Sequence, residues 1–359
     1  MKAWQGSVGI SDYHGIVSPD YLVCSVDASV ESRFFHHLLR SGPLVTQFGI
    51  RSKGIRPAQW RLYWEDLAEI SVSLPPLDEQ RRIADFLDAE TARIDALTTR
   101  RLAQVASLGE LELARIGAQL CGSDRSRMGR MRTGWEWLPT IPGDWSVGPV
   151  YAYFDVQLGK MLNTDRASGE GQQPYLRNAN VHWYEVSTFD LATMAFEPGE
   201  RSRYGVKKGD LLVCEGGAGV AEAAVWDGQT PEVFYQKSLH RVRAISNVPV
   251  EWLMYWLRFS KAAGVFDADG NLATIPHLTG EQLAAYRIPI PCDGRRRVAV
   301  LNSEIAAIHK TQAEMTAANA LLAERRRALI TAAVTGQIDV TTARGADTSG
   351  LPLAGGASV

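Results

Sequence analysis

The most regular hydrophobic pattern in the chain lies near its C-terminal end. Apolar residues recur there at alternating steps of three and four positions: Val298, Leu301, Ile305, Ile308, Met315, Leu322 and Leu329. This spacing is typical of a coiled-coil seam, in which one stripe of a helix packs against another helix. Polar residues interrupt the seam at Gln312, Asn319 and Arg326, where they can fix the register. The pattern predicts a long helix over residues 292–337 that requires a helical partner.

The expected partner is a second long helix, which the sequence predicts over residues 75–121. Its apolar stripe is less regular and begins with Ile83, Leu87, Ile94 and Leu97. An offset of about 214 residues superimposes the two helices and aligns these identical pairs: Glu110 with Glu324, Ala114 with Ala328, Ile116 with Ile330, Ala118 with Ala332, and Gly122 with Gly336. Proline precedes each copy and glycine follows it, as at ordinary helix ends. We expect the copies to pack together; the alternative is that they only dimerise the chain.

The repeat extends to the segments that precede each helix, residues 1–74 and 135–291. Val30-Glu31 matches Val250-Glu251, and residues 67–72 match residues 283–288. The chain is thus a globular domain followed by a long helix, written twice. Residues 135 to about 210 have no counterpart in the first copy, so Met1 stands opposite roughly residue 210. We expect a partial first domain, which would be a fragment, a misplaced start or a natural truncation.

Local patterns predict the character of the remaining segments. Residues 209–214 predict a turn followed by a buried strand, residues 234–242 predict another strand, and residues 249–259 predict an aromatic-rich core helix. Residues 122–134 carry four arginines among small polar residues, which indicates a flexible basic linker; contact with phosphates is the alternative. Residues 338–359 are rich in Gly, Ala and Ser and are predicted to be disordered.

Composition narrows the protein classes. A formal charge of −2, with 45% hydrophobic and 22% charged residues, is typical of an ordinary globular protein. The four cysteines lie far apart, which favours a reduced, cytoplasmic compartment. No apolar run approaches the ~18 residues of a membrane span, so we expect no membrane partner. Residues 135–291 hold 13 basic and 18 acidic residues, a balance of −5, so DNA contact would need a local basic face.

No arrangement of residues in the sequence indicates catalysis. The glycine-rich turn at residues 215–219 lacks the third glycine of a dinucleotide-binding motif and the lysine of a P-loop. A His-Glu-x-x-His metal helix, a Gly-x-Ser-x-Gly elbow and the Asn/Asp-Pro-Pro-aromatic stretch of amino-methyltransferases are missing from the sequence. We therefore expect neither an enzyme nor a metal site.

The remaining polar residues suit contact with nucleic acid. Candidates in the second domain are Lys160 in a turn, Arg177, Asn178 and Asn180 in one short loop, and Lys237, His240 and Arg241 along a predicted strand. Arginine and asparagine make bidentate contacts with guanine and adenine edges. The corresponding candidates in the first domain are Lys2, Gln5, Arg51, Lys53 and Arg56. For each of these residues an ordinary surface role is the alternative.

The repeated plan resembles the specificity (S) subunit of type I restriction-modification systems. The resemblance spans nearly all of residues 1–340 and is most specific at residues 74–84, 174–181 and 321–336. It implies an α+β fold, with two mixed α/β target-recognition domains separated by two long antiparallel coiled-coil helices. The segments would be a partial first recognition domain (1–74), a first helix (75–121), a linker (122–134), a second recognition domain (135–291), a second helix (292–337) and a tail (338–359).

The same resemblance implies a non-catalytic reader of double-stranded DNA. Each recognition domain would read one half of a split sequence, and the helices would set the gap and dock two methyltransferase (M) subunits. Nuclease-translocase (R) subunits would join this complex. S-adenosylmethionine would be held by the M subunit, so no cofactor is expected on this chain. A second hypothesis, a coiled-coil scaffold that binds proteins, explains the helices and the acidic second domain but not the arginine–asparagine loop.

Overall fold

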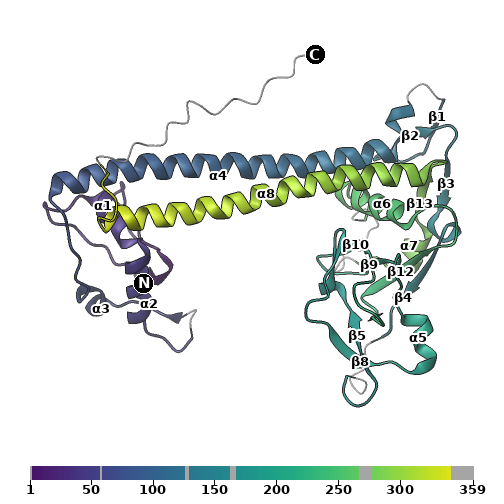
Figure 1. Ribbon diagram of the computed structural model, residues 1–359, viewed down its shortest axis with the longest axis horizontal. Helices are drawn as coiled ribbons and strands as arrows, with labels where there is room; N and C mark the ends of the chain where they lie inside the picture. Colours follow the sequence, from purple (N-terminus) through teal and green to yellow (C-terminus); the bar gives the residue numbers. More distant parts are fainter. Residues whose placement is uncertain (1, 57–58, 126–128, 162–166, 267–276, 341–359) are drawn as a thin grey trace. The chain divides into compact units, whose positions relative to one another are not determined.

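The computed structural model describes residues 2–56, 59–125, 129–161, 167–266 and 277–340 (Figure 1). The chain divides into two units. Unit 1 comprises residues 1–106 and 312–359, and unit 2 comprises residues 107–311. The two long helices, α4 (Leu77–Leu120) and α8 (Gly294–Val334), each contribute residues to both units. The predicted disordered tail lies almost entirely outside the described residues.

Both long helices end at the glycines that the repeat aligns. Gly122 and Gly336 follow the last turns with φ angles of 59° and 72°. This left-handed conformation is cheap for glycine and lets the chain leave the helix while its last carbonyls are still hydrogen-bonded. After α8, for example, Gln337 N donates to Ala332 O at 2.8 Å. The two copies therefore share their C-terminal caps as well as their sequence pattern.

In unit 1 the α4 and α8 segments pack antiparallel. Arg326 Nε lies 3.1 Å from Asp95 Oδ1, while Gln312, earlier in α8, donates its Nε2 to the carbonyl of Val105, later in α4, at 3.4 Å. Two of the polar residues that interrupt the predicted seam thus bind across it. The apolar seam residues Ile83, Leu87 and Ile94 are buried, and Met315, Leu322 and Leu329 are half-buried.

Leu97 does not lie in the seam. Its side chain is 40% exposed, whereas the neighbouring Thr98 is half-buried and continues the stripe from Ile94. The stripe then runs through Arg101 and Val105, both half-buried, at steps of three and four. The prediction for Leu97 was wrong because the middle of this seam is partly polar, so the apolar residue beside it was mistaken for a seam position.

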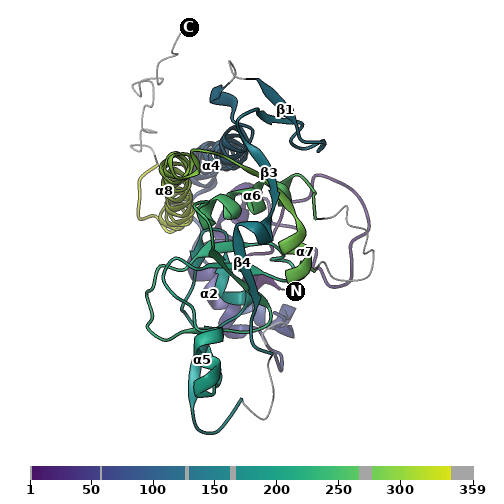
Figure 2. The same cartoon turned by 90° about the vertical axis from the view of Figure 1, so that its right-hand side faces the viewer.

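In unit 2 the same two helices are also antiparallel and form a more apolar seam. Val298, Leu301, Ile305 and Ile308 of α8 are all buried, as predicted. They belong to one core cluster with Ile116 and Leu120, two further buried residues that come from α4. Two right-angled views show α4 and α8 side by side in this unit (Figures 1 and 2).

The rest of unit 1 is helical and irregular in its described part. Its elements are η1 (Ala3–Gln5), α1 (Ser32–Leu39), α2 (Gly42–Arg51) and α3 (Trp64–Ala68). Phe34, Phe48 and Leu62 pack in one cluster with Leu87 of α4 and Ile330 of α8. The described residues of unit 1 form no strand, and their one isolated bridge joins Lys53 to Arg61. The α+β class predicted from the sequence is confirmed, with its strands contributed by unit 2.

Unit 2 contains the sheets. A four-stranded sheet has the order β10-β9-β12-β4 and is antiparallel throughout, with strands β4 (Phe154–Leu158), β9 (Leu211–Cys214), β10 (Ala223–Val225) and β12 (Leu239–Ala244). A three-stranded sheet has the order β11-β5-β8, with β5 (Gln172–Leu176), β8 (Ala192–Ala195) and β11 (Phe234–Tyr235). Three two-stranded pairs complete the unit: β1 (Arg130–Arg132) with β2 (Thr140–Pro142), β3 (Ser146–Pro149) with β13 (Arg287–Ile290), and β6 (Val181–His182) with β7 (Glu185–Val186).

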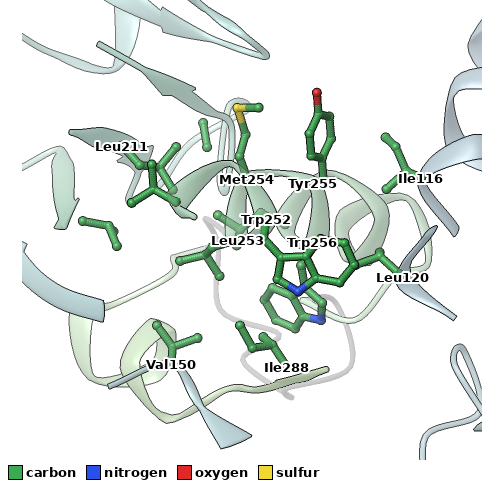
Figure 3. Packing of buried hydrophobic residues seen from close by; sticks show 14 of the residues in the cluster. Ile116, Leu120, Val150, Leu211, Trp252, Leu253, Met254, Tyr255, Trp256 and Ile288 are labelled. Carbon is green, nitrogen blue, oxygen red and sulfur yellow. The ribbon is translucent and has the colours of Figure 1, made fainter. Parts of the chain in front are cut away.

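Helix α6 (Val250–Ala262) occupies the centre of the largest core. Trp252, Leu253 and Trp256 are fully buried, and the Trp252 indole donates to Pro289 O at 2.8 Å. Figure 3 shows Ile116 and Leu120 of α4 on one side of α6 and Leu211 of the four-stranded sheet on another. The helix predicted from the aromatic pattern therefore joins the sheet to α4 and α8 within unit 2. The shorter helices described in the unit are η3 (Ser123–Arg125), η4 (Val150–Ala152), η6 (Asn178–Asn180), α5 (Pro198–Tyr204) and α7 (Gly280–Ala285).

The predicted flexible linker is largely folded in its described part. Arg125 pairs with Asp144 and, at 3.1 Å, with Asp293. Arg130 lies in strand β1 and donates to Cys121 O at 2.8 Å. The arginines were predicted to be solvated because the sequence does not show the carboxylates and carbonyls that meet them from distant segments. Separately, none of the described helices combines the length and the apolar character needed to cross a membrane.

Candidate nucleic-acid interface

The loop that follows β5 is held in one shape by Asn180. This side chain is buried; its Oδ1 accepts a hydrogen bond from Arg177 N at 3.1 Å, and its Nδ2 donates to Ser187 O at 3.2 Å. All of its amide is thus used inside the protein. Asn180 was predicted to contact DNA, and its burial leaves no surface for that contact. Its role in the fold is to fix the loop that carries Arg177 and Asn178.

Asn178 joins three segments that are far apart in the sequence. Its backbone N donates to Ser238 Oγ at 3.1 Å, and its Nδ2 donates to Gly216 O at 2.7 Å. Gly216 in turn forms an isolated bridge with His277. We call Arg177, Asn178, Gly216, Lys237, Ser238 and His277 the polar loop cluster. The glycine-rich turn is therefore part of a folded platform.

Three side chains of the polar loop cluster are available to a ligand. Lys237 and His277 are exposed, and the Arg177 side chain is 39% exposed beside Asp190, with 3.6 Å between Arg177 Nη2 and Asp190 Oδ2. Such a pair is open to solvent and therefore weak, so Arg177 can exchange Asp190 for another acceptor. The cluster offers a guanidinium, an ammonium and an imidazole group on a backbone fixed by hydrogen bonds.

Lys160 supports the platform from inside. Its side chain is 6% exposed; its Nζ pairs with Glu200, donates to Ala195 O at 3.0 Å and lies 4.8 Å from the ring centre of Phe196. The backbone carbonyl of Lys160 accepts a hydrogen bond from Lys237 N at 2.8 Å. Lys160 was predicted to contact DNA; because it is buried and paired, it instead positions Lys237. The adjoining residues 162–163 of that predicted turn lie outside the described residues.

His240 and Arg241 are also buried and cannot reach DNA. Burial lowers the pKa of His240, and its Nε2 lies 2.8 Å from Leu278 O. Arg241 donates to Arg203 O at 2.7 Å and to Gln157 Oε1 at 2.6 Å. The prediction assumed that alternate side chains of this strand face solvent. It failed because β12 is covered on both faces. His240 and Arg241 point to opposite faces of the strand, and both are therefore buried.

A basic stretch that the sequence reasoning overlooked lies at α5. Arg201, Arg203, Lys207 and Lys208 are all exposed, and no acidic residue stands between them in the sequence. In both views α5 lies at the end of unit 2 away from α4 and α8 (Figures 1 and 2). The sequence contains four basic residues within eight positions, but the prediction considered the net charge of the whole domain, which is negative. This stretch is a local basic face of the kind that DNA contact requires.

The candidates of unit 1 fall into two places. Lys2 and Gln5 are exposed and line a hollow of about 270 Å³ together with Arg61, which pairs with Asp20 at 3.0 Å. Lys53 pairs with Asp66 at 2.7 Å, and Arg56 is exposed. Arg51, which is half-buried, donates to Gln47. Lys2 and Gln5 therefore line the same hollow, whereas Arg51, Lys53 and Arg56 are not among its lining residues.

A buried carboxylate joins α4, α6, α8 and the turn at Tyr184 within unit 2. Glu112 of α4 accepts hydrogen bonds from Tyr184 Oη at 2.8 Å, Arg258 Nε of α6 at 2.9 Å and His309 Nε2 of α8 at 3.0 Å. Sequence reasoning did not single out any of the four. Only the folded chain brings them together, and this polar junction adds to the apolar core that holds α6 against α4 and α8 within unit 2.

The described residues contain no group of three or more His, Cys, Asp or Glu side chains placed to hold a metal ion. Sequence and fold comparisons bear on the function more directly. Residues 28–107 match the family model of the type I restriction modification DNA specificity domain. The match covers the end of the irregular segment, α1 to α3 and most of α4.

Three chains in solved structures are similar to this one to different degrees. One is a chain in a structure described as the structural basis underlying complex assembly and conformational transition of the type I R-M system; it has a TM-score of 0.64 and 18% identity, over 85% of this chain and 71% of that chain. Another is the HsdS subunit from Thermoanaerobacter tengcongensis, with a TM-score of 0.49 and 19% identity over 86% and 71%. A third is the type I restriction-modification S subunit from M. genitalium, with a TM-score of 0.40 and 14% identity over 85% and 73%.

Proposed function

We propose that this chain, whose residues 28–107 match the type I restriction modification DNA specificity domain, reads DNA sequence for a restriction-modification complex. The observation that carries the proposal for unit 2 is the polar loop cluster. Its backbone is fixed by Asn178 and Asn180, while Arg177 and Lys237 remain open to solvent. A reader needs this combination, because side chains on a preformed loop lose less entropy when they bind.

The side chains available to DNA suit two kinds of contact. Arg177 has the planar donor pair that matches the O6 and N7 atoms of guanine in the major groove. Lys237 and the basic stretch at residues 201–208 suit phosphates, which fix the register of a protein on the duplex without reading sequence. Within unit 2, base reading is therefore assigned to the loop that carries Arg177, and positioning to the lysines and the α5 arginines.

The partners follow from the family. We expect methyltransferase subunits to dock on α4 and α8 and nuclease-translocase subunits to join them, with the chemistry supplied by those partners. S-adenosylmethionine would be bound by the methyltransferase subunit, and this chain would carry no cofactor and perform no catalysis. We expect it to act in the cytoplasm, a reduced compartment that suits its four scattered cysteines. The two repeats would each read one half of a split target, with unit 1 contributing through Lys2, Gln5 and Arg56.

The test is to express this chain in a host together with a type I methyltransferase subunit encoded beside it, and to map the methylated bases of the host DNA. The expected result is methylation at one sequence, which disappears when this chain is omitted. Methylation of the same sites by the methyltransferase alone would contradict a role in sequence recognition. A complex that forms but binds random and matched DNA equally well would favour the alternative of a protein-binding scaffold.

A further inference from the structure

The turn that follows β7 presents an aromatic side chain to solvent. Phe189 is 87% exposed, whereas every other phenylalanine of the chain is buried or half-buried. The next residue, Asp190, has a φ angle of 55°, a left-handed conformation that non-glycine residues adopt at a cost. A phenyl ring gains free energy when it leaves water, so a ring held out in solvent is a candidate contact for a ligand.

The backbone of this turn is fixed by hydrogen bonds. Phe189 N donates to Ser187 Oγ at 3.3 Å, and Phe189 O accepts from Asn180 Nδ2 at 3.4 Å. Ser187 N in turn donates to Asn180 O at 2.7 Å. Both polar backbone groups of Phe189 are therefore bonded inside the protein while its ring stays in solvent. A ligand that covers the ring does not have to order the turn first.

The side chain that fixes Phe189 also fixes Arg177. Asn180 Oδ1 accepts a hydrogen bond from Arg177 N at 3.1 Å, while its Nδ2 holds the carbonyl of Phe189. A second link joins the two segments, because Arg177 Nη2 lies 3.6 Å from Oδ2 of Asp190, the neighbour of Phe189 in the chain. The guanidinium and the phenyl ring thus belong to one fixed element and meet the same ligand.

The chemistry of the turn suits the edge of a base and not the phosphate backbone. Residues 178–200 contain no lysine or arginine, and the carboxylate of Asp190 next to the ring would repel a phosphate. In the major groove the 5-methyl group of thymine is an apolar group, and phenylalanine is one of the residues that contact it. Arg177 is assigned to guanine in the same groove, so its neighbour Phe189 is placed to reach a thymine methyl group.

We propose that Phe189 contacts the 5-methyl group of a thymine in the half of the DNA target that unit 2 reads. The inference rests on the proposed function of the chain and adds to it a residue that determines specificity. Cytosine has no methyl group at this position, so the contact distinguishes thymine from cytosine without a hydrogen bond. Arg177 and Phe189 together would then read one polar and one apolar feature of neighbouring bases.

The experiment removes the methyl group from the DNA and the ring from the protein, separately and together. Each thymine of the target is replaced in turn by deoxyuridine, and the affinity of the assembled complex is measured for every duplex. The unaltered complex should lose about fourfold in affinity at one thymine, as expected for one buried methyl group. Phe189→Ala should lose about tenfold on the unmodified target and should show no further loss when that same thymine is deoxyuridine.

Ile245→Ala is the matched control, since Ile245 is another apolar side chain of unit 2 and is 62% exposed. This variant should bind as the unaltered complex does and keep its sensitivity to deoxyuridine, and neither variant should change the midpoint of urea unfolding.

Several outcomes would overturn the proposal. One is a complex that recognises its target but is insensitive to deoxyuridine at every thymine. Another is a sensitive thymine that stays equally sensitive in Phe189→Ala. A loss of affinity in Phe189→Ala that is the same for all duplexes would assign the ring to insertion between base pairs instead, and loss of the methyltransferase subunit from the complex would assign it to a protein contact. Equal binding of target and random DNA by the unaltered complex would overturn the proposed function together with this inference.

Discussion

At the scale of single residues, Glu112 is the clearest case of a side chain whose surroundings set its chemistry. Burial raises the pKa of this carboxyl, but hydrogen bonds from Tyr184, Arg258 and His309 lower it more, so the pKa lies below its ordinary value. A carboxyl whose pKa is lowered by folding stabilises the fold above its ordinary pKa. That stabilisation is lost as the pH falls through the folded pKa.

This sign gives a testable pH dependence. Glu112→Gln should lower the unfolding free energy of unit 2 by about 1.5–3 kcal/mol at pH 7, since it removes a hydrogen-bonded charge. The deficit should begin to shrink as the pH falls below about 4.3, where the carboxyl of the unfolded chain takes up a proton, and it should be lost as the pH falls through the lower folded pKa. Urea unfolding followed by tryptophan fluorescence at a series of pH values measures both effects. Glu110→Gln, an exposed glutamate of the same helix, is the control and should change neither. A constant deficit from pH 7 to pH 3 would contradict the assignment.

Arg177 carries the prediction about base reading. Arg177→Ala should cost about 1–3 kcal/mol for the matched DNA target and should relax discrimination at one base pair. Lys237→Ala, the control from the same cluster, should weaken matched and mismatched DNA about equally, as a phosphate contact does. Competition binding of the assembled complex to both DNAs distinguishes the two. Equal losses for Arg177→Ala on both DNAs would assign it to phosphate instead, and unchanged binding would remove it from the interface.

The candidate site shows how far residue-level reasoning reaches. Arg177, Asn178 and Lys237 were predicted from residue type and do lie together in the polar loop cluster. Lys160 and Arg241 were chosen by the same logic and are buried. Residue type identifies groups that can bind DNA, but exposure depends on neighbours from distant strands. The sequence of a single strand does not show whether one face or both will be covered.

At the scale of elements, the two long helices could be predicted because their signals are local and repeated. The steps of three and four along α8 mark a seam that is confirmed by the burial of Val298, Leu301 and Ile305. The less regular α4 gave the wrong position at Leu97, since half-buried polar residues continue its seam. Pairings between strands were not predicted, because nothing local in β9 or β12 specifies which distant strand lies beside it.

The two terminal glycines allow a matched prediction at this scale. Both Gly122 and Gly336 have positive φ angles, so alanine at either position should cost about 1–2 kcal/mol in backbone strain. A Cβ on Gly336 would meet nothing within 4 Å, whereas a Cβ on Gly122 would lie 2.5 Å from Pro142 Cγ. Gly122→Ala should therefore cost about 1–3 kcal/mol more, because the neighbouring ring must move. Amide exchange in the last turns of α4 and α8 measures the two costs separately. Equal costs would mean that Pro142 moves away without penalty.

At the scale of the whole molecule, the net charge of the sequence does not describe how charge is distributed over the surface. The chain carries −2 overall, and its second domain is acidic, yet the basic stretch at residues 201–208 is exposed on one element. Average charge governs solubility and long-range repulsion, whereas phosphate contacts depend on the few cations that reach the backbone. The acidic balance of the domain is therefore compatible with DNA binding through a local face.

This local face predicts how binding should respond to salt. Each phosphate neutralised by a side chain adds about 0.9 to the slope of log K against log salt concentration. If Lys207 and Lys208 each contact a phosphate, Lys207→Gln combined with Lys208→Gln should lower that slope by about 2 for matched and random DNA alike. The control pair is Arg295→Gln with Arg296→Gln, which removes the same charge from exposed residues at the start of α8 in the same unit. Titrations of the assembled complex between about 50 and 200 mM salt provide the slopes. A drop of equal size for both pairs would show that only net charge matters, and no drop for the lysine pair would place the DNA away from α5.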